Sequence, residues 1–250
     1  MNNVLMQKLR GGETLVFGHR GASEYAPMNT LEAFTLAAEM GAHGVELDVH
    51  RSADGHAVIV HDFTVDASTD GSGEVNKMTL ATLKALDAGS WKGEAYRGAQ
   101  IPTLDEVFET VGQLLFINVE IKSRGYKTDG VEQVAADTIR RHQMESRVIV
   151  SSFNPLALRR FRRILPEVPL GYLTAAGMPS YVRLLSIGMQ TEAIHPHHSQ
   201  IDAELVARAG ERVVNTWTVN DAERARELRD LGVGVIISDK PDVILDALAQ

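Results

Sequence analysis

Three carboxylates on two apolar strands are the side chains of this sequence with the clearest chemical potential. Glu46 and Asp48 lie in the run 44–49, and Glu120 lies in a second alternating run, 115–122. Side chains two residues apart on a strand share a face, so these acids face away from the apolar side chains between them. Buried unpaired carboxylates cost several kcal/mol each, and a metal compensates them. We predict one divalent metal ion, and oxygen ligands favour Mg²⁺, Ca²⁺ or Mn²⁺ over zinc.

Two histidines and two cations accompany these acids in the sequence. His19 and Arg20 end the strand-like run 14–18, His61 follows the apolar residues 57–60, and Lys122 comes two residues after the third acid. Histidines exchange protons near neutral pH, and cations stabilise the charge that develops on a phosphate. This set therefore predicts the splitting of a phosphodiester. The alternatives are ordinary loop histidines and an ion-pair network between the acids and the two cations.

Two aromatic residues are candidates for the wall of a substrate site. Trp217 shares a strand face with Asn215, and Phe153 follows another strand. Either ring could form an apolar wall against a substrate, or stack on a cationic group by a cation–π contact. The alternative for both is packing in the core.

Strand-like and helix-like patterns alternate along the chain and must position these residues. Strands are expected at 14–18, 44–50, 115–122, 147–152, 169–173, 192–195, 212–218 and 234–238, with a hairpin-like extension at 56–61. Helices are expected at 29–40, 101–113, 129–143 and 155–165, after Pro179, and from Asp202, Asp221 and Pro241. Eight such units predict an α/β fold, a (β/α)₈ TIM barrel, in a single domain, 1–250. An open doubly wound sheet is the alternative.

Residues 62–100 break this alternation, because they have few periodic apolar positions and several turn residues. We expect a small insertion there, after the second strand, and not a linker between domains. Further along the chain, Tyr181, Leu184 and Leu185 suit either an interface or a buried core, and the sequence does not decide between the two.

Composition excludes several classes of function. The 250 residues are 44% hydrophobic and 23% charged, with a net charge of -8 that argues against binding to nucleic acid. The absence of cysteine excludes disulfides, thiolate catalysis and cysteine-bound zinc. No apolar stretch suits a membrane span or a leader peptide, so we expect no stable membrane insertion and a cytoplasmic location. The sequence does not indicate an oligomeric state.

Two further motifs have ordinary explanations. His195-Pro-His-His198 has no recognised metal-ligand spacing. The basic run 159–163 alternates with Leu158, Phe161 and Ile164, which is typical of the solvated face of an amphipathic helix.

Several motifs in one order resemble the glycerophosphodiester phosphodiesterase family. They are 18–30 (Gly-His-Arg-Gly-Ala-Ser-Glu-Tyr-Ala-Pro-Met-Asn-Thr), 46–48 with 61–62, 91–98, 101–106, 118–122, 151–153, 216–220 and 238–242. The resemblance spans essentially the whole chain. It implies a barrel with the active site at the carboxyl ends of the strands.

The resemblance also implies roles for individual residues. Magnesium or calcium would bind Glu46, Asp48 and Glu120, with Arg20 and Lys122 beside the phosphate. A glycerol hydroxyl would attack the phosphate to give a cyclic phosphate, which water would then open.

His19 would be the base and His61 the acid in that reaction. The expected products are glycerol 3-phosphate and an alcohol. The alternatives are a lysophospholipase D-like or other phosphodiesterase activity of the same superfamily, and a non-catalytic phosphodiester-binding protein.

One residue departs from the family pattern. Met28 stands where the family usually carries Glu, and a thioether neither holds charge nor accepts a hydrogen bond strongly. We expect lower metal affinity or a shifted substrate preference, with activity retained.

Overall fold

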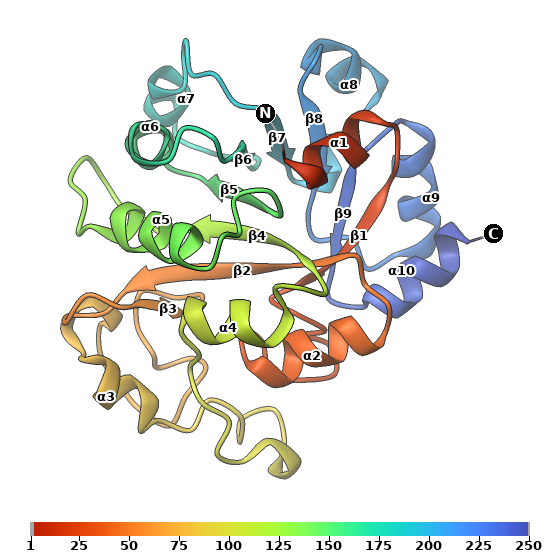
Figure 1. Cartoon of the computed structure of the whole chain (residues 1–250). Coiled ribbons are helices and arrows are strands. Elements are labelled where there is room, and N and C mark those ends of the chain that lie inside the picture. The colour runs from red at the N-terminus through yellow and green to blue at the C-terminus, as the bar shows by residue number, and fades with distance from the viewer. Residues whose placement is uncertain (1–2, 250) are drawn as a thin grey trace.

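Eight parallel strands form a closed ring in the computed structural model, which describes residues 3–249 (Figure 1). The strands of the ring are β1 (Leu15–His19), β2 (Gly44–Arg51), β4 (Phe116–Ile121), β5 (Val148–Ser152), β6 (Leu170–Thr174), β7 (Ala193–Pro196), β8 (Val213–Thr216) and β9 (Val235–Ser238). The ring closes because β1 pairs with both β2 and β9. This closure confirms the predicted (β/α)₈ TIM barrel, since an open sheet would leave two free edges.

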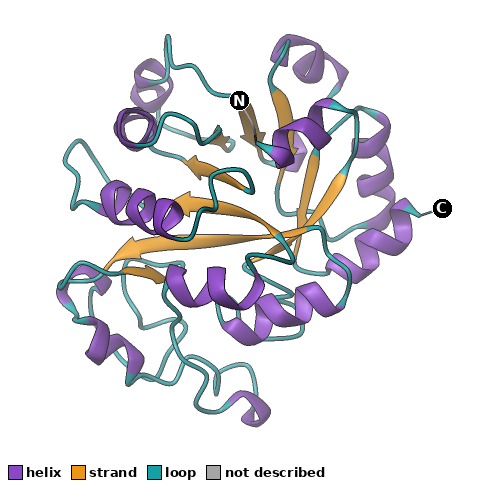
Figure 2. Cartoon of the chain, in the orientation of Figure 1, coloured by secondary structure: helices purple, strands orange, loops and turns teal. Residues whose placement is uncertain are grey.

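Helices surround the ring and follow the expected alternation (Figure 2). They are α1 (Val4–Arg10), α2 (Leu31–Glu39), α3 (Leu80–Lys84), α4 (Leu104–Val111), α5 (Val131–Arg141), α6 (Pro155–Ile164), α7 (Ser180–Leu185), α8 (Ala203–Ala209), α9 (Ala222–Asp230) and α10 (Pro241–Leu248). The start of α4 is fixed by a capping box, which the N-cap residue Thr103 forms with Glu106. No helix among residues 3–249 has the length and apolar character needed to cross a membrane.

The barrel interior is layered, because every second residue of a strand points inward. Its floor is apolar: Leu15 and Phe17 of β1 pack there with inward side chains of other strands. The helix α1, which the sequence analysis does not predict, adds Leu5 and Leu9 to this floor. Asn3 caps α1 and also donates hydrogen bonds to the carbonyl oxygens of 145 and 148. The amino-terminal end of the ring is therefore plugged.

A polar layer lies one inward step above this floor. It consists of the buried residues Asn118, Ser151, His195 and Asn215. Asn215 Nδ2 lies 2.9 Å from His195 Nε2, and burial lowers the pKa of His195 to about 3, so this ring is neutral. A Cβ on Gly171 would collide with the same ring, which explains the glycine in β6. The next inward residues towards the carboxyl ends of the strands form the candidate site.

The predicted insertion is a separate small layer outside the ring. The strand β3 (Ala57–Ile59) pairs antiparallel with β2, and the segment between β3 and α4 carries α3 and the short 3₁₀ turns η1 (Val75–Lys77) and η2 (Glu94–Tyr96). A small core of its own includes Val65, Val75 and Leu83.

The insertion also reaches the loop after β1. Lys92 Nζ donates to the Ser23 carbonyl, and the Tyr96 hydroxyl donates to the Tyr25 carbonyl. It therefore supports the segment that follows His19.

Candidate active site

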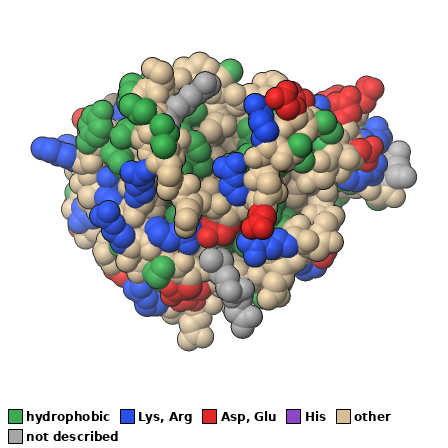
Figure 3. Space-filling model, turned by 90° about the horizontal axis from the view of Figure 1, so that it is seen from above, with side chains coloured by type: hydrophobic (Ala, Val, Ile, Leu, Met, Phe, Trp, Pro, Cys, Tyr) green, Lys and Arg blue, Asp and Glu red, His purple; other side chains and the backbone are tan. Residues whose placement is uncertain are grey.

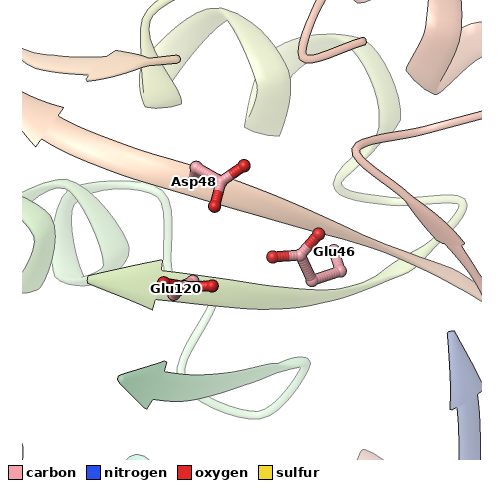
Figure 4. Close-up of side chains that lie close together, drawn as sticks. All are labelled: Glu46, Asp48 and Glu120. Carbon is pink, nitrogen blue, oxygen red and sulfur yellow. The ribbon is translucent and has the colours of Figure 1, made fainter. Parts of the chain in front are cut away.

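Three carboxylates from the neighbouring strands β2 and β4 converge inside the barrel (Figure 4). Each of Glu46, Asp48 and Glu120 offers an oxygen, and these oxygens all lie within 4.8 Å of one another. The parallel register causes this, because it sets Asp48 opposite Glu120 and Glu46 opposite Asn118. All three are buried, and they are the only such group of potential ligands among residues 3–249.

Asp48 is the carboxylate that the protein itself neutralises most fully. Lys122 Nζ lies 3.1 Å from its Oδ1, and Arg20 Nε lies 3.2 Å from its Oδ2. Asn29 Nδ2 also donates to Oδ2 over 2.8 Å. Burial alone would raise the pKa of Asp48, but Lys122 and Arg20 hold it well below its usual range. This carboxylate is therefore ionised.

The other two carboxylates are not fully compensated by the cations of the protein, and their charged forms are disfavoured. Burial, with the charge of the neighbouring acids, raises the pKa of Glu46 well above its usual range and the pKa of Glu120 to about 7. Lys122 lies 2.9 Å from Glu120, whereas Glu46 accepts only a 3.2 Å hydrogen bond from the Arg20 amide. The ion-pair network is thus present, yet it leaves Glu46 uncompensated.

The arrangement fits a divalent cation. Two cations face three carboxylates, and the buried amide of Asn118, beside Glu46, has no hydrogen-bond partner for either Oδ1 or Nδ2. A hard cation with oxygen ligands would remove the charge imbalance and suits an amide oxygen nearby.

His19 is held by a residue from the other end of the chain. Its Nδ1 lies 2.7 Å from Asp239 Oδ1, and its Nε2 lies 4.0 Å from Glu46 Oε2. The Asp239 carboxylate also accepts hydrogen bonds from Ser23 Oγ and Asn220 Nδ2. Burial would raise the pKa of Asp239, but the hydrogen bond from His19 holds it below its usual range.

No role for Asp239 is predicted from the sequence. The closure of the predicted barrel could have indicated this residue, because the residues after the last strand of a barrel meet those after the first.

His61 faces the same site from beyond β3. Its Nδ1 lies 2.9 Å from Asp62 Oδ1, and its side chain is 37% exposed. Burial, with the charges of Lys122 and Arg20, lowers the pKa of His61. The two histidines therefore differ: His19 is anchored by a partly buried carboxylate, and His61 lies at the opening.

These residues line one small cavity of about 60 Å³. Its lining is His19, Arg20, Glu46, His61, Asn118, Glu120, Lys122, Phe153, Leu173, Trp217 and Ile237. Of the predicted site residues, only Asp48 is absent from this lining, because it lies behind Lys122 and Arg20. The cavity has carboxylates and cations on one side and rings on the other.

The rings form an ordered aromatic wall. Phe153 and Trp217 meet edge to face with centroids 5.5 Å apart, and His197 meets Trp217 in the same way at 5.1 Å. Trp217 Nε1 donates to the His195 carbonyl over 2.9 Å. Trp217 also packs on the barrel floor. It therefore belongs both to the core and to the wall of the cavity.

Two sequence motifs remain, the histidine run 195–198 and the basic run 159–163, and both have structural explanations. His195 belongs to the polar layer inside the barrel. On α6, Leu158 and Phe161 are buried while Arg160 pairs with Glu132, as expected for an amphipathic helix.

Met28 lies against one of the phosphate-binding candidates. Its Sδ is 3.3 Å from Arg20 Nη1. A carboxylate at this position would face the same guanidinium.

Comparison with known proteins gives a consistent picture. The model of the "Glycerophosphoryl diester phosphodiesterase family" matches residues 19–243. A glycerophosphodiester phosphodiesterase of Caldanaerobacter subterraneus is 40% identical over 241 residues, covering 95% of this chain and 99% of that protein. One of Bacillus altitudinis is 33% identical, covering 92% and 96%.

Solved structures agree with the sequence matches. An Oleispira antarctica phosphodiesterase in complex with the product sn-glycerol-3-phosphate superposes with a TM-score of 0.86 at 34% identity, covering 97% of this chain and 99% of that one. A structure from Silicibacter pomeroyi described as a glycerophosphoryl diester phosphodiesterase has the same TM-score at 28% identity, covering 99% and 97%.

Proposed function

Because the chain belongs to the glycerophosphoryl diester phosphodiesterase family and is a phosphoric diester hydrolase, we propose that it uses a divalent metal ion and two histidines to hydrolyse glycerophosphodiesters. The products are glycerol 3-phosphate and an alcohol. One observation supports this most: two carboxylates of the buried three-carboxylate cluster and both histidines line the same 60 Å³ cavity. The product bound in the Oleispira antarctica structure supports the same substrate class.

Glu46, Asp48 and Glu120 are the proposed metal ligands. The ion is Mg²⁺ or Ca²⁺, with Mn²⁺ as a further possibility, because all the ligands are oxygen atoms. When bound, the ion supplies positive charge that favours an ionised hydroxyl and offsets the charge developing on the phosphate.

His19 acts as the base in this proposal. With Asp239 at Nδ1, its Nε2 faces the cavity and takes the proton from the glycerol hydroxyl next to the phosphate. That oxygen bonds to phosphorus, and the bond from phosphorus to the head-group oxygen breaks. His61 gives a proton to the departing oxygen, so the alcohol leaves neutral.

Water completes the hydrolysis with the histidine roles reversed. His61 takes a proton from water as it attacks the cyclic phosphate, and His19 returns the proton to the glycerol oxygen. One water is consumed, and both histidines regain their starting states.

The other residues of the cavity bind and orient the substrate. Arg20 and Lys122 hold the phosphate oxygens, since both line the cavity on the side of the acids. Phe153 and Trp217 form the apolar wall against the glycerol or head group.

The test is release of glycerol 3-phosphate from glycerophosphocholine and glycerophosphoethanolamine. We expect release that EDTA abolishes and that Mg²⁺, Ca²⁺ or Mn²⁺ restores. Glu46→Gln should lose both this restoration and the metal-induced rise in melting temperature, whereas Glu109→Gln, on the exposed face of α4, should keep both. Release that is indifferent to EDTA would refute the metal role. Substrate binding without release under any metal would favour the non-catalytic alternative.

A further inference from the structure

A second, larger cavity adjoins the catalytic one at the carboxyl ends of β2 and β4. Its volume is about 480 Å³. Inward side chains recur at every second residue of a strand, so His50 follows Asp48 and Lys122 follows Glu120 on the inner face, and His50 and Lys122 both line this cavity. Lys122 also lines the catalytic cavity. The two cavities therefore meet at this side chain.

Two segments far apart in the sequence form the walls of this second cavity. One wall is the start of the insertion after β3, which includes Phe63 and Glu74, and the other is the loop 122–129 after β4. Arg124 joins the two walls, because its guanidinium carbon lies 3.5 Å from the centroid of the Phe63 ring. The insertion and the barrel thus build this cavity together.

The position of His61 directs the head group of a bound substrate into the second cavity. In the proposed mechanism His61 protonates the departing head-group oxygen, so the head group lies on its side of the phosphate. The His61 carbonyl lies 3.3 Å from Nε2 of His50, which lines this cavity, as does Phe63, two residues further along. His19, the proposed base for the glycerol hydroxyl, lines the catalytic cavity instead. This division agrees with a displacement in which the attacking and leaving oxygens lie on opposite sides of phosphorus.

Unpaired charges of both signs line the second cavity. They are Arg124, Lys127, Glu74 and Asp129. Lys122 pairs with Asp48 and Glu120, but the structure shows no ion pair within residues 3–249 for the other four. Asp129 Oδ1 accepts a hydrogen bond from the Val131 amide. Opposite charges that share a cavity without pairing are complementary to a ligand that carries both charges.

The ring of Phe63 is taken up by contacts within the protein. The Arg124 guanidinium covers one face of it, and the His50 ring meets it at right angles with centroids 4.8 Å apart. A choline is recognised by open aromatic faces, which this cavity does not supply. The apolar surface of the molecule lies elsewhere, since Figure 3 shows hydrophobic side chains gathered on the side of the upper face where α6 and α7 lie. The second cavity therefore favours a head group that is recognised by ion pairs.

We propose that this cavity binds a zwitterionic head group, in which one carbon carries an ammonium and a carboxylate, as in glycerophosphoserine. The inference rests on the proposed function and names the head group that this chain prefers. Arg124 and Lys127 bind the carboxylate, and Glu74 and Asp129 bind the ammonium. The bonds that form and break are those of the proposed hydrolysis, and the alcohol that leaves with the proton from His61 is serine.

The experiment compares kcat/KM on three substrates that differ only in the head group. Glycerophosphoserine carries both charges, glycerophosphoethanolamine carries the ammonium alone, and glycerophosphoglycerol carries neither. An exposed ion pair is worth up to about fivefold in binding, so the serine substrate should exceed the ethanolamine substrate by about fivefold or more. The ratio between these two should shrink as ionic strength rises, because salt screens exposed charges.

Charge-removing variants locate the source of this preference. In Arg124→Gln and Lys127→Gln the ratio of the serine to the ethanolamine substrate should fall, and in the double variant it should approach one. Glu74→Gln should lower the ratio of the ethanolamine to the glycerol substrate. Lys77→Gln is the matched control, because Lys77 is an exposed cation on η1 that does not line the cavity.

The outcomes separate this inference from the proposed function. Hydrolysis of all three substrates with equal kcat/KM would overturn the inference and leave the proposed function standing. A serine preference that persists in the double variant would also overturn it, as would an equal fall in Lys77→Gln, which would assign the effect to the overall charge of the surface. Absence of glycerol 3-phosphate release from every substrate would instead count against the proposed function itself.

Discussion

His19 Nδ1 lies 2.7 Å from Asp239 Oδ1, although 220 positions separate the two residues. They meet because β1 and β9 are neighbours in the ring, with Gly18 opposite Ser238. The carboxylate occupies one ring nitrogen and turns the other towards the carboxylate cluster. This is the arrangement in which an aspartate fixes the tautomer of a histidine base.

We expect Asp239→Asn to lower kcat by at least about tenfold with little change in KM, because acid–base steps depend on the tautomer and orientation of the base. Steady-state kinetics on glycerophosphocholine measures this. Asp242→Asn is the control, since Asp242 bonds to the Tyr25 hydroxyl and not to a histidine. Equal kcat for the native protein and Asp239→Asn would show that the pair has no part in the reaction.

The division of labour between the histidines predicts different responses to the leaving group. His61→Ala should lose about 10²- to 10⁴-fold in the rate of alcohol release from a choline ester, and should regain most of that rate on a p-nitrophenyl ester, which departs without a proton. Opening of the cyclic phosphate, in which His61 is the base, should stay slow with both substrates. His19→Ala should be impaired on both substrates. The reverse pattern would exchange the two roles.

The carboxylate cluster predicts that the metal-free protein loses stability as pH rises. The pKa of Glu120 is about 7 in the folded protein, against 4.5 for the free side chain. A raised folded pKa means that stability is fully present below pH 4.5 and is lost as pH rises towards 7. Between pH 5 and 7.5 in EDTA, the native protein should lose about 2 kcal/mol more than Glu120→Gln.

Urea unfolding at the two pH values measures this loss. Glu109→Gln should behave like the native protein, and an added divalent ion should reverse the loss in both of these proteins. Parallel pH profiles for the native protein and Glu120→Gln would mean that the cluster carries no excess charge.

The polar layer predicts a separate loss of stability in acid. Burial lowers the pKa of His195 to about 3, against 6.5 for the free side chain. With the folded pKa below the unfolded one, stability is present above pH 6.5 and is lost as pH falls towards 3. Between pH 7 and 5 the native protein should lose about 2 kcal/mol more than His195→Gln. His56→Gln is the control, because His56 lies at an exposed turn, and a slope shared by both variants would contradict the assignment.

Met28→Glu should change the metal site through Arg20. A carboxylate there would pair with the guanidinium that now contacts the Met28 thioether and Asp48. We expect tighter metal binding, or a changed preference between glycerophosphocholine and glycerophosphoethanolamine. Metal titration and paired kinetics measure the two effects. Met28→Gln has the shape of Met28→Glu without its charge and separates the two effects. Identical metal binding and kinetics of the native protein and both variants would show that this position does not affect the site.

Local patterns were enough to predict most of the fold. The alternation of Val45, Leu47 and Val49 with two acids identifies both the strand and the face that carries chemistry, because the period of a strand is independent of what surrounds it. Helices such as α4 carry their start signals in adjacent residues. The nine predicted site residues lie in strands or shortly after them, which explains why eight of them line one cavity and the ninth lies directly behind it.

The tertiary structure decided what depends on ring closure and register. Asp239 reaches His19 only because the last strand pairs with the first, and α1 becomes part of the barrel floor only because its Leu5 and Leu9 meet inward side chains from several strands. Tyr181, Leu184 and Leu185 suit a core or an interface equally well in sequence. Packing beside Phe153 places Tyr181 and Leu185 at a cavity and leaves Leu184 exposed. The type and spacing of residues therefore determined the chemistry available to this protein. Which groups meet was set by contacts between strands and loops far apart in the chain, and no local pattern encodes those contacts.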